Sequence, residues 1–371
     1  MKNFLRNFPI EMYVLLFPSI LFLLVVSVYL TFQGSTFIED FFHGYFLYQL
    51  FAIDVILPVV TLVLASNLVE ISIMLSKGVE RSLIFRFLRS AFFLLSVFSI
   101  SLVSLSVGVQ FVFMKADPVR VATMSVMFTH WDHVLFGAYP WISWHSFFTG
   151  PCLQQFIYFS YSSLVSVLII VLVVSFLHKT HILRKLVLSF CLVTFLGMPF
   201  WIALPSLSPD LMYRVNILGV SVQSDVKESL EGTSFSKITE DTLDTLEKFW
   251  SDPKKESLPV TSFPSMHAAW GVIVTVVGIE LWAPSAFFLI PWLLAELVAT
   301  VLTLEHYAVD TIFGALLGLL ALCVASRLLS FDKKRFVDKW DLFLSIGQIQ
   351  TDLEKAVDWL KAKIKYALKL T

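Results

Sequence analysis

The chain is poor in cysteine and in charge, and both shortages limit what it can be. Only three of its 371 residues are cysteine, and these three (Cys152, Cys191 and Cys323) lie too far apart to predict a disulfide framework or a metal cluster. Charged residues make up 15% of the chain against 57% hydrophobic residues, and the mean hydropathy is +0.80. A soluble domain does not have this balance, whereas a bundle of apolar helices does.

Long apolar runs are abundant. A membrane-spanning helix needs about 20 apolar residues, and this length criterion predicts an all-α, polytopic membrane helix bundle. The first run is too long for a cleavable signal peptide and no small-x-small cleavage site follows it, so we expect an anchor. The eight predicted spans cover residues 11–32, 47–67, 88–114, 156–177, 186–204, 265–283, 286–304 and 308–329.

The predicted spans divide the chain into three parts. Residues 1–87 hold two transmembrane helices, residues 88–330 hold six more and a long loop at 205–264, and residues 331–371 form an amphipathic helical tail. We expect the tail either to lie on the anionic inner leaflet or to pack on the end of the bundle. The loop holds ten acidic and six basic residues, so it offers no basic surface to a nucleic acid. A short amphipathic helix is predicted within it, around residues 238–249.

The distribution of basic residues predicts the orientation in the membrane. With eight spans both termini lie on one side. That side carries Lys or Arg near both termini and in the loops that follow the second and fourth spans, from Lys2 to Lys339. The opposite side has no Lys or Arg between residues 31 and 47. The positive-inside rule therefore places the termini in the cytoplasm and the other side outside the cell or in a lumen.

Two short segments that carry histidines open predicted spans on that extracytoplasmic side. One covers residues 263–269, with the sequence FPSMHAA, and the other begins with His306 and reaches Asp310. His306 and Asp310 are four residues apart and share a helical face. The 39 residues from His267 to His306 allow one span down, a turn near residues 283–284 and one span back, so both histidines return to a common depth.

A histidine that pairs with a carboxylate and faces a second histidine supplies a nucleophile, its orienting group and a proton donor. The alternative is that both are interfacial histidines with structural partners only. Beside them, Pro264 is predicted in the first turn of a helix that Ser262 or Ser265 caps. The Ser265 hydroxyl and the N–H groups of that turn would then bind phosphate oxygens.

These residues resemble a known family. Residues 263–267 resemble the second signature of the type 2 phosphatidic acid phosphatase superfamily, and His306-x3-Asp310 resembles the third. The resemblance covers roughly residues 88–330. Further features are similar to the inositol phosphorylceramide synthase-like (inositolphosphotransferase) branch: Tyr307 after the histidine, Gly314, Gly318, and the upstream segment 132–140, DHVLFGAYP.

The resemblance implies a six-helix catalytic core and a metal-independent, cofactor-free reaction through a phosphohistidine. It implies that His306 is the nucleophile, that Asp310 orients it, and that His267 protonates the leaving oxygen. Ser265 and neighbouring amides would hold the phosphoryl oxygens, because the charge that develops on them needs preorganised donors.

The chain departs from the family pattern in two places. The first signature, a Lys and an Arg-Pro pair that bind phosphate, is absent after the fifth predicted span, and Arg214 is the only base nearby. Arg214 is the candidate replacement because a guanidinium binds phosphate bidentately, although an ordinary interfacial Arg is the alternative. The Arg that usually lies six residues before the third-signature histidine is Thr300 here.

Other polar residues have simpler predicted roles. Asp54 and Glu296 fall inside spans, where a carboxylate either has a function or, as we favour, bonds a Ser, Thr or Trp of a neighbouring helix. Lys115 and Arg120 are expected at the head-group layer. The aromatic residues from Trp131 to Trp144 are expected to form an interfacial belt.

We therefore predict an integral membrane enzyme that acts on lipid phosphate esters at the extracytoplasmic leaflet. The donor is a phospholipid or polyprenyl phosphate, and the acceptor is a lipid or polyol hydroxyl. Two alternatives remain open: a simple lipid phosphate phosphatase, or a non-catalytic transporter or scaffold that keeps the fold. A vanadium haloperoxidase shares these motifs but is a soluble protein.

Overall fold

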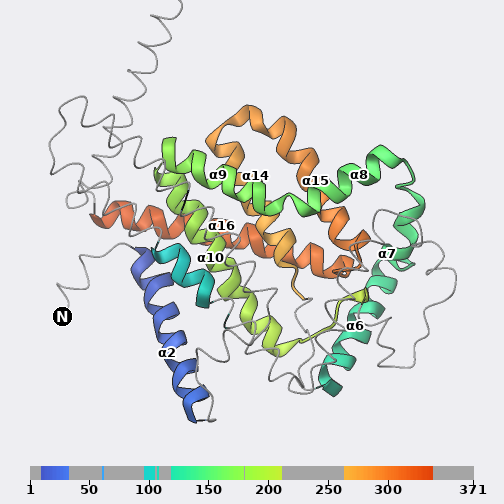
Figure 1. Cartoon of the computed structure of the whole chain (residues 1–371), viewed down its shortest axis with the longest axis horizontal. Coiled ribbons are helices and arrows are strands. Elements are labelled where there is room, and N and C mark those ends of the chain that lie inside the picture. The colour runs from blue at the N-terminus through green and yellow to red at the C-terminus, as the bar shows by residue number, and fades with distance from the viewer. Residues whose placement is uncertain are drawn as a thin grey trace, which may run out of the picture.

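The structure is a computed structural model that describes residues 10–32, 61, 96–104, 107, 118–178, 180–210 and 263–336. Helices build this part of the chain, with no strand among these residues, which confirms the all-α prediction for it (Figure 1). A further helical stretch covers residues 96–104. The longer helices are α2 (Phe17–Phe32), α6 (Pro118–Phe136), α8 (Pro151–Ser162), α9 (Leu164–His178), α10 (Thr180–Ala203), α14 (Met266–Leu281), α15 (Ala286–Leu302) and α16 (Ala308–Phe336). The shorter ones are η1 (Met12–Leu16), α7 (Pro140–Ser143), η2 (Trp144–Ser146) and η3 (Ala283–Ser285).

The centre of the described fold is formed by α10, α14, α15 and α16. α14 and α15 form a hairpin around η3, and α16 packs against both α14 and α10 (Figure 1). α14 and α16 touch backbone to backbone, because a Cβ at Gly314 would lie 2.1 Å from the Ser265 carbonyl oxygen and one at Gly318 would lie 2.6 Å from that of Ala269. These two glycines therefore bring the start of α14 directly onto α16.

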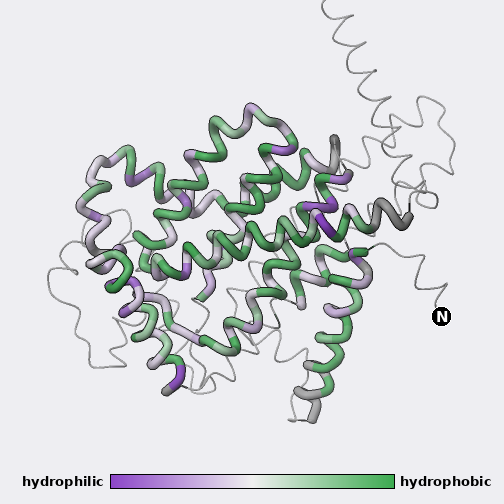
Figure 2. Tube along the Cα trace, turned by 180° about the vertical axis from the view of Figure 1, so that it is seen from behind, coloured by the Kyte–Doolittle hydropathy of each residue, from purple (hydrophilic) through white to green (hydrophobic). Residues whose placement is uncertain are grey.

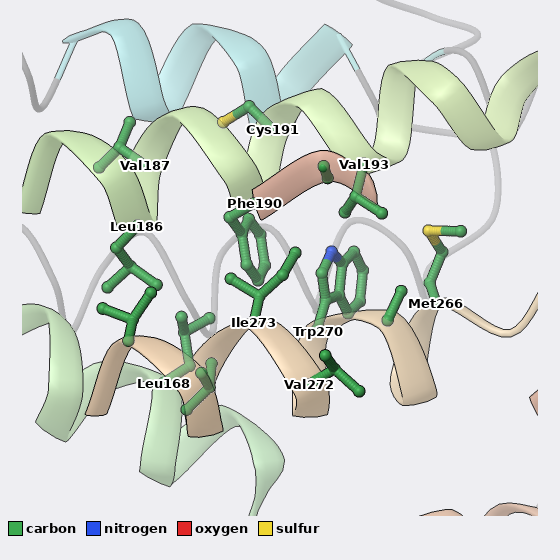
Figure 3. Close-up of a cluster of buried hydrophobic side chains, with 14 of the residues drawn as sticks. Leu168, Leu186, Val187, Phe190, Cys191, Val193, Met266, Trp270, Val272 and Ile273 are labelled. Carbon is green, nitrogen blue, oxygen red and sulfur yellow. The ribbon is translucent and has the colours of Figure 1, made fainter. Parts of the chain in front are cut away.

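An apolar core lies among α9, α10 and α14 (Figure 3). Phe190 of α10 stacks on Trp270 of α14 with ring centroids 4.8 Å apart and planes 13° apart. Leu168, Leu186 and Ile273 fill the same cluster. Dense packing of this kind fixes the relative positions of the helices, so α14 has a rigid support below its first turn.

Ion pairs tie the helices together at the far end of α14. Arg184 of α10 donates two hydrogen bonds to the buried carboxylate of Glu11, at 2.5 and 2.8 Å. Its neighbour Lys185 pairs with Glu280, in the last turn of α14, at 2.5 Å. These charges therefore lie at the opposite end of α14 from Ser265.

Within the described part of the chain, three helical segments are long and apolar enough to cross a membrane: His181–Ala203, Ala283–Leu302 and Ala308–Phe331. Hydrophobic residues run along most of the helices (Figure 2). Tyr13–Val25 and Met266–Leu281 are shorter apolar helices. These helices are what we expect of an integral membrane protein.

The predicted span at 156–177 is not one straight helix. α8 and α9 meet at Ser163 with a bend of 57°, so they form either one broken span or a re-entrant loop. The Ser163 hydroxyl donates to the Ser160 carbonyl oxygen at 3.1 Å and accepts from the Trp292 indole of α15 at 2.8 Å. A serine hydroxyl that bonds the preceding turn commonly bends a helix, which the apolar pattern alone did not reveal.

Several sequence predictions fall on residues outside the described part. These are the span at 47–67 apart from Thr61, much of the span at 88–114, Asp54, Lys115, Arg214, nearly all of the loop 205–264 and most of the tail 331–371. The division into three parts, the eight spans and the six-helix core therefore remain predictions.

The segment that we expected to form an interfacial belt has more order than its polar sequence suggests. α6 is one unbroken helix up to Phe136, and Gly137, with φ 69°, ends it by donating to the His133 carbonyl oxygen at 2.9 Å. Trp131 is exposed as a belt residue would be, but Trp141 is buried against α15 and α16. Arg120 donates to the Ala203 carbonyl oxygen at 2.6 Å and thereby ties α6 to the end of α10.

Candidate active site

The first turn of α14 is built by Ser265. Its backbone is extended (φ −64°, ψ 114°) and its hydroxyl oxygen accepts from the Ala268 N–H at 3.3 Å, so Ser265 is the N-cap. Pro264 therefore precedes the helix, and our prediction of Pro264 in the first turn is wrong. The peptide bond between Phe263 and Pro264 is cis. The Ser265 N–H donates to the Asp310 backbone carbonyl oxygen at 3.2 Å, which joins the start of α14 to the first turn of α16.

The connection between α15 and α16 brings His306 into place. Leu304 has a φ of 61°, a left-handed conformation that is uncommon for a side chain of this size, and it turns the chain sharply. The His306 N–H then donates to the Thr300 carbonyl oxygen at 3.1 Å. Tyr307 follows as the residue before α16, and its carbonyl oxygen accepts from the Thr311 N–H.

Asp310 contacts both His306 and the start of its own helix. Its Oδ2 atom lies 3.7 Å from His306 Nδ1 and accepts from the Tyr307 N–H at 3.1 Å. Asp310 is fully buried, and His306 is 8% exposed. The carboxylate is therefore held near the Nδ1 side of the ring, which leaves Nε2 on the opposite side.

The two histidines lie close together, as their spacing predicts. The ring centroids of His267 and His306 are 6.2 Å apart, with an angle of 55° between the planes. His267 also stacks on Tyr161 of α8, with centroids 4.7 Å apart and planes 14° apart. His267 is partly exposed, whereas Asp310 beside His306 is fully buried.

Asp132 is a member of the site to which sequence reasoning gave no role. It is fully buried on α6, where its two carboxylate oxygens accept from the N–H groups of Ala308 at 3.0 Å and Val309 at 2.9 Å. Burial raises the pKa of the Asp132 carboxyl from 3.8 to about 6, the two N–H bonds oppose the rise, and the charge of Asp310 adds to it. The only signal in the sequence was its position at the start of the segment 132–140.

An aromatic cluster joins α6 to both signature segments. Phe128 stacks on Phe263 with centroids 4.5 Å apart and planes 17° apart, and it lies 6.0 Å from the ring of Tyr307. Phe128, Phe263, Tyr307 and Val309 are all buried. α6 thus supports residues just before His267 and just after His306.

Thr300 stands where the family usually has an arginine, and its hydroxyl makes a buried contact. The Thr300 hydroxyl lies 2.8 Å from that of Thr311 and also donates to the Leu297 carbonyl oxygen. Arg214, the candidate replacement for the first signature, lies outside the described residues.

Glu296 differs from our prediction. It is fully buried on α15, and its two oxygens bond no Ser, Thr or Trp within the described residues. The nearby Trp292 bonds Ser163 instead. Glu296 packs against α14, where a Cβ at Gly271 would lie 2.8 Å from its Oε2 atom.

No set of three His, Cys, Asp or Glu side chains in the described segments is arranged to hold a metal ion. Neither a curated protein nor a solved structure matches the chain. A family model described as the PAP2 superfamily, the type 2 phosphatidic acid phosphatases of the resemblance above, matches residues 127–324. This match spans more than half of the chain and includes Asp132, Ser265, His267, His306 and Asp310. The chain therefore belongs to the PAP2 superfamily.

Proposed function

We propose that this protein is an integral membrane enzyme that moves a phosphoryl or phospho-head group from a lipid donor by way of a phosphohistidine at His306. The observation that carries the proposal is the convergence of three groups at the starts of two helices. His267 and His306 face each other with ring centroids 6.2 Å apart, and Asp310 lies 3.7 Å from the His306 ring.

This geometry supports the following first step. Asp310 lies on the Nδ1 side of His306, so that nitrogen carries the hydrogen and the Nε2 lone pair attacks phosphorus. The N–P bond forms as the bond to the leaving oxygen breaks, and protonated His267 gives its proton to that oxygen. Ser265, whose hydroxyl oxygen accepts from Ala268, has its own hydrogen left to donate to a phosphoryl oxygen.

In the second step His267 acts as a base, and His306 becomes the leaving group. Neutral His267 takes the proton from an acceptor hydroxyl, the new O–P bond forms, and the N–P bond to His306 breaks. The acceptor is a lipid or polyol hydroxyl in a transferase and water in a phosphatase. Burial of Asp310 and His306 supports transfer, because a site with little solvent access disfavours hydrolysis of the intermediate.

The donor is expected to be a phospholipid or a polyprenyl phosphate. His267 lies in the shorter apolar helix Met266–Leu281, and His306 lies between the candidate spans Ala283–Leu302 and Ala308–Phe331. A lipid phosphate could therefore approach the site along the membrane. The head-group specificity of the inositol phosphorylceramide synthase-like branch remains a proposal that rests on the segment 132–140 and on Gly314 and Gly318.

A lipid panel tests the function. Purified full-length protein is incubated with phosphatidic acid, phosphatidylinositol, phosphatidylcholine or a polyprenyl phosphate, with and without ceramide or diacylglycerol, and products are identified by mass spectrometry. New head-group esters that need the acceptor indicate a transferase, and acceptor-independent orthophosphate indicates a phosphatase. A wild-type protein that converts no donor contradicts the proposal and favours a non-catalytic membrane protein.

A further inference from the structure

We propose that Asp132 is a positioning residue of this reaction, because its carboxylate fixes the first turn of α16 and so the His306–Asp310 pair. This inference rests on the proposed function. Asp132 lies on α6, 176 residues before Ala308 in the sequence, and both of its oxygens bond the backbone of α16.

The first argument is that two carboxylates share the backbone N–H donors at the start of α16. Three successive N–H groups are bonded by carboxylates: Asp310 accepts from Tyr307, and Asp132 accepts from Ala308 and Val309. The first N–H groups of a helix lack partners within the helix and attract a nearby carboxylate. Because Asp132 occupies two of them, the Asp310 carboxylate stays at Tyr307, where its Oδ2 atom also faces His306.

The second argument is that α6 is itself fixed at this point. Phe128 lies one turn before Asp132 on α6 and stacks on Phe263, next to the start of α14. The same ring contacts the cluster of Tyr307 and Val309. α6 therefore holds the segments of both histidines, and Asp132 is its polar contact with the histidine–aspartate pair.

The third argument is the free-energy cost of burying the Asp132 carboxylate at the start of α16. A buried carboxylate is expensive unless its oxygens are well bonded. A Ser or Asn would cap a helix at lower cost. A second buried carboxylate beside Asp310 is difficult to explain by helix capping alone, and fixing two donors with one rigid, bidentate group explains it.

The experiment compares two variants that weaken the contact between Asp132 and the start of α16 from opposite sides. Asp132→Asn keeps the shape of the side chain but offers one acceptor oxygen in place of two. Ala308→Pro removes the N–H that Asp132 Oδ2 accepts, at the first position of α16, where proline is well tolerated. Both are made in the full-length chain and assayed on the panel lipid that the wild type converts fastest.

We expect each variant to lower kcat by about 100-fold, because a displacement of roughly 1 Å at the reacting groups has that effect. KM should change little, since Ser265 and α14 still bind the phosphate. The double variant should lose no more than either single one, because both remove one contact.

Ser125→Ala is the matched control. Ser125 is buried on the same helix and its hydroxyl accepts from the Leu207 N–H at 2.9 Å, away from α16. This variant should lose thermal stability but keep the wild-type kcat per folded molecule. If Asp132→Asn does not fold, the kcat of Ala308→Pro alone tests the proposal.

The inference is overturned if the folded variants keep the wild-type kcat and lose only stability, because Asp132 is then purely structural. A wild type that converts no lipid instead rejects the proposed function, and the role of Asp132 is rejected with it. The two failures are therefore distinguishable in one set of assays.

Discussion

At the scale of single residues, the two histidines differ in what holds them. His306 has a carboxylate 3.7 Å from Nδ1, whereas His267 has an aromatic ring stacked on it at 4.7 Å. A paired carboxylate orients a nucleophile and stabilises the cation that it forms. A stacked ring fixes the plane of His267 without adding a negative charge, which suits a group that must release its proton.

The role of His267 as an acid predicts how its loss depends on the leaving group. His267→Gln should lower kcat by about 10²–10⁴-fold for a lipid donor, because the alkoxide must leave without a proton. The loss should be much smaller for p-nitrophenyl phosphate, whose leaving group needs no protonation. Steady-state kinetics with both substrates measures the loss of kcat on each.

The control for that prediction is His130→Gln, which changes an exposed histidine on α6. It should leave both activities unchanged. An equal loss on both substrates in His267→Gln contradicts the role of His267 as the acid.

Asp132 predicts a specific pH dependence of stability. Burial raises the pKa of its carboxyl to about 6, so the folded protein binds a proton that the unfolded chain releases. The stabilisation that this bound proton gives to the folded state is complete below about pH 4 and is lost as the pH rises through about 6. Lowering the pH from about 7 to about 5 should therefore stabilise the wild type relative to Asp132→Asn by on the order of 1 kcal/mol.

Thermal unfolding of both proteins across this pH range measures the difference. A constant difference in the free energy of unfolding between pH 7 and pH 5 contradicts the raised pKa of Asp132.

At the scale of the helices, the contact between α14 and α16 depends on two glycines. A Cβ at Gly314 would lie 2.1 Å from the Ser265 carbonyl oxygen, a backbone atom that cannot move alone. Gly314→Ala should separate the helices, lower the free energy of unfolding by about 3 kcal/mol or more, and abolish activity by displacing Ser265. Thermal unfolding and the lipid assay measure both effects.

Gly278→Ala is the matched comparison on α14. Its Cβ would lie 2.5 Å from Leu289 Cδ1, the end of a flexible side chain that can move aside. This variant should lose less stability and keep its activity. Equal effects of the two substitutions contradict the account of a rigid backbone contact.

How far the sequence predicted these elements depends on the range of the interaction. The proximity of His267 and His306 followed from two helices of similar length joined by a turn, so it was predictable. The bend at Ser163 was not, because the apolar pattern does not show that the Ser163 hydroxyl bonds the Ser160 carbonyl oxygen and accepts from the indole of Trp292, 129 positions away. The contact of Asp132 with α16 was equally unpredictable, because its partners Ala308 and Val309 are far away in the sequence.

At the scale of the whole molecule, the charge pattern predicts that the site faces away from the cytoplasm. Lys185 and Glu280 mark the end of α14 opposite to Ser265. Thr149 is exposed beside Phe148, which packs on the end of α15 nearest His306, and Pro284 is exposed in the turn at the other end of α15. The predicted orientation therefore places these two positions on opposite faces of the membrane.

Cysteine labelling on intact cells or oriented vesicles tests this orientation. In a background without Cys152, Cys191 and Cys323, Thr149→Cys should react with a membrane-impermeant maleimide from the extracytoplasmic side. Pro284→Cys should react only after permeabilisation. The reverse pattern contradicts the orientation that the positive-inside rule predicts.

The most direct test of the account is to isolate the covalent intermediate. Full-length protein is incubated with a donor labelled with ³²P in its phosphate, quenched rapidly in alkali, digested, and mapped by mass spectrometry. We predict an alkali-stable, acid-labile phosphohistidine at His306 that is absent from His306→Ala. Label on another residue, or turnover by the His306→Ala variant at the wild-type rate, contradicts it.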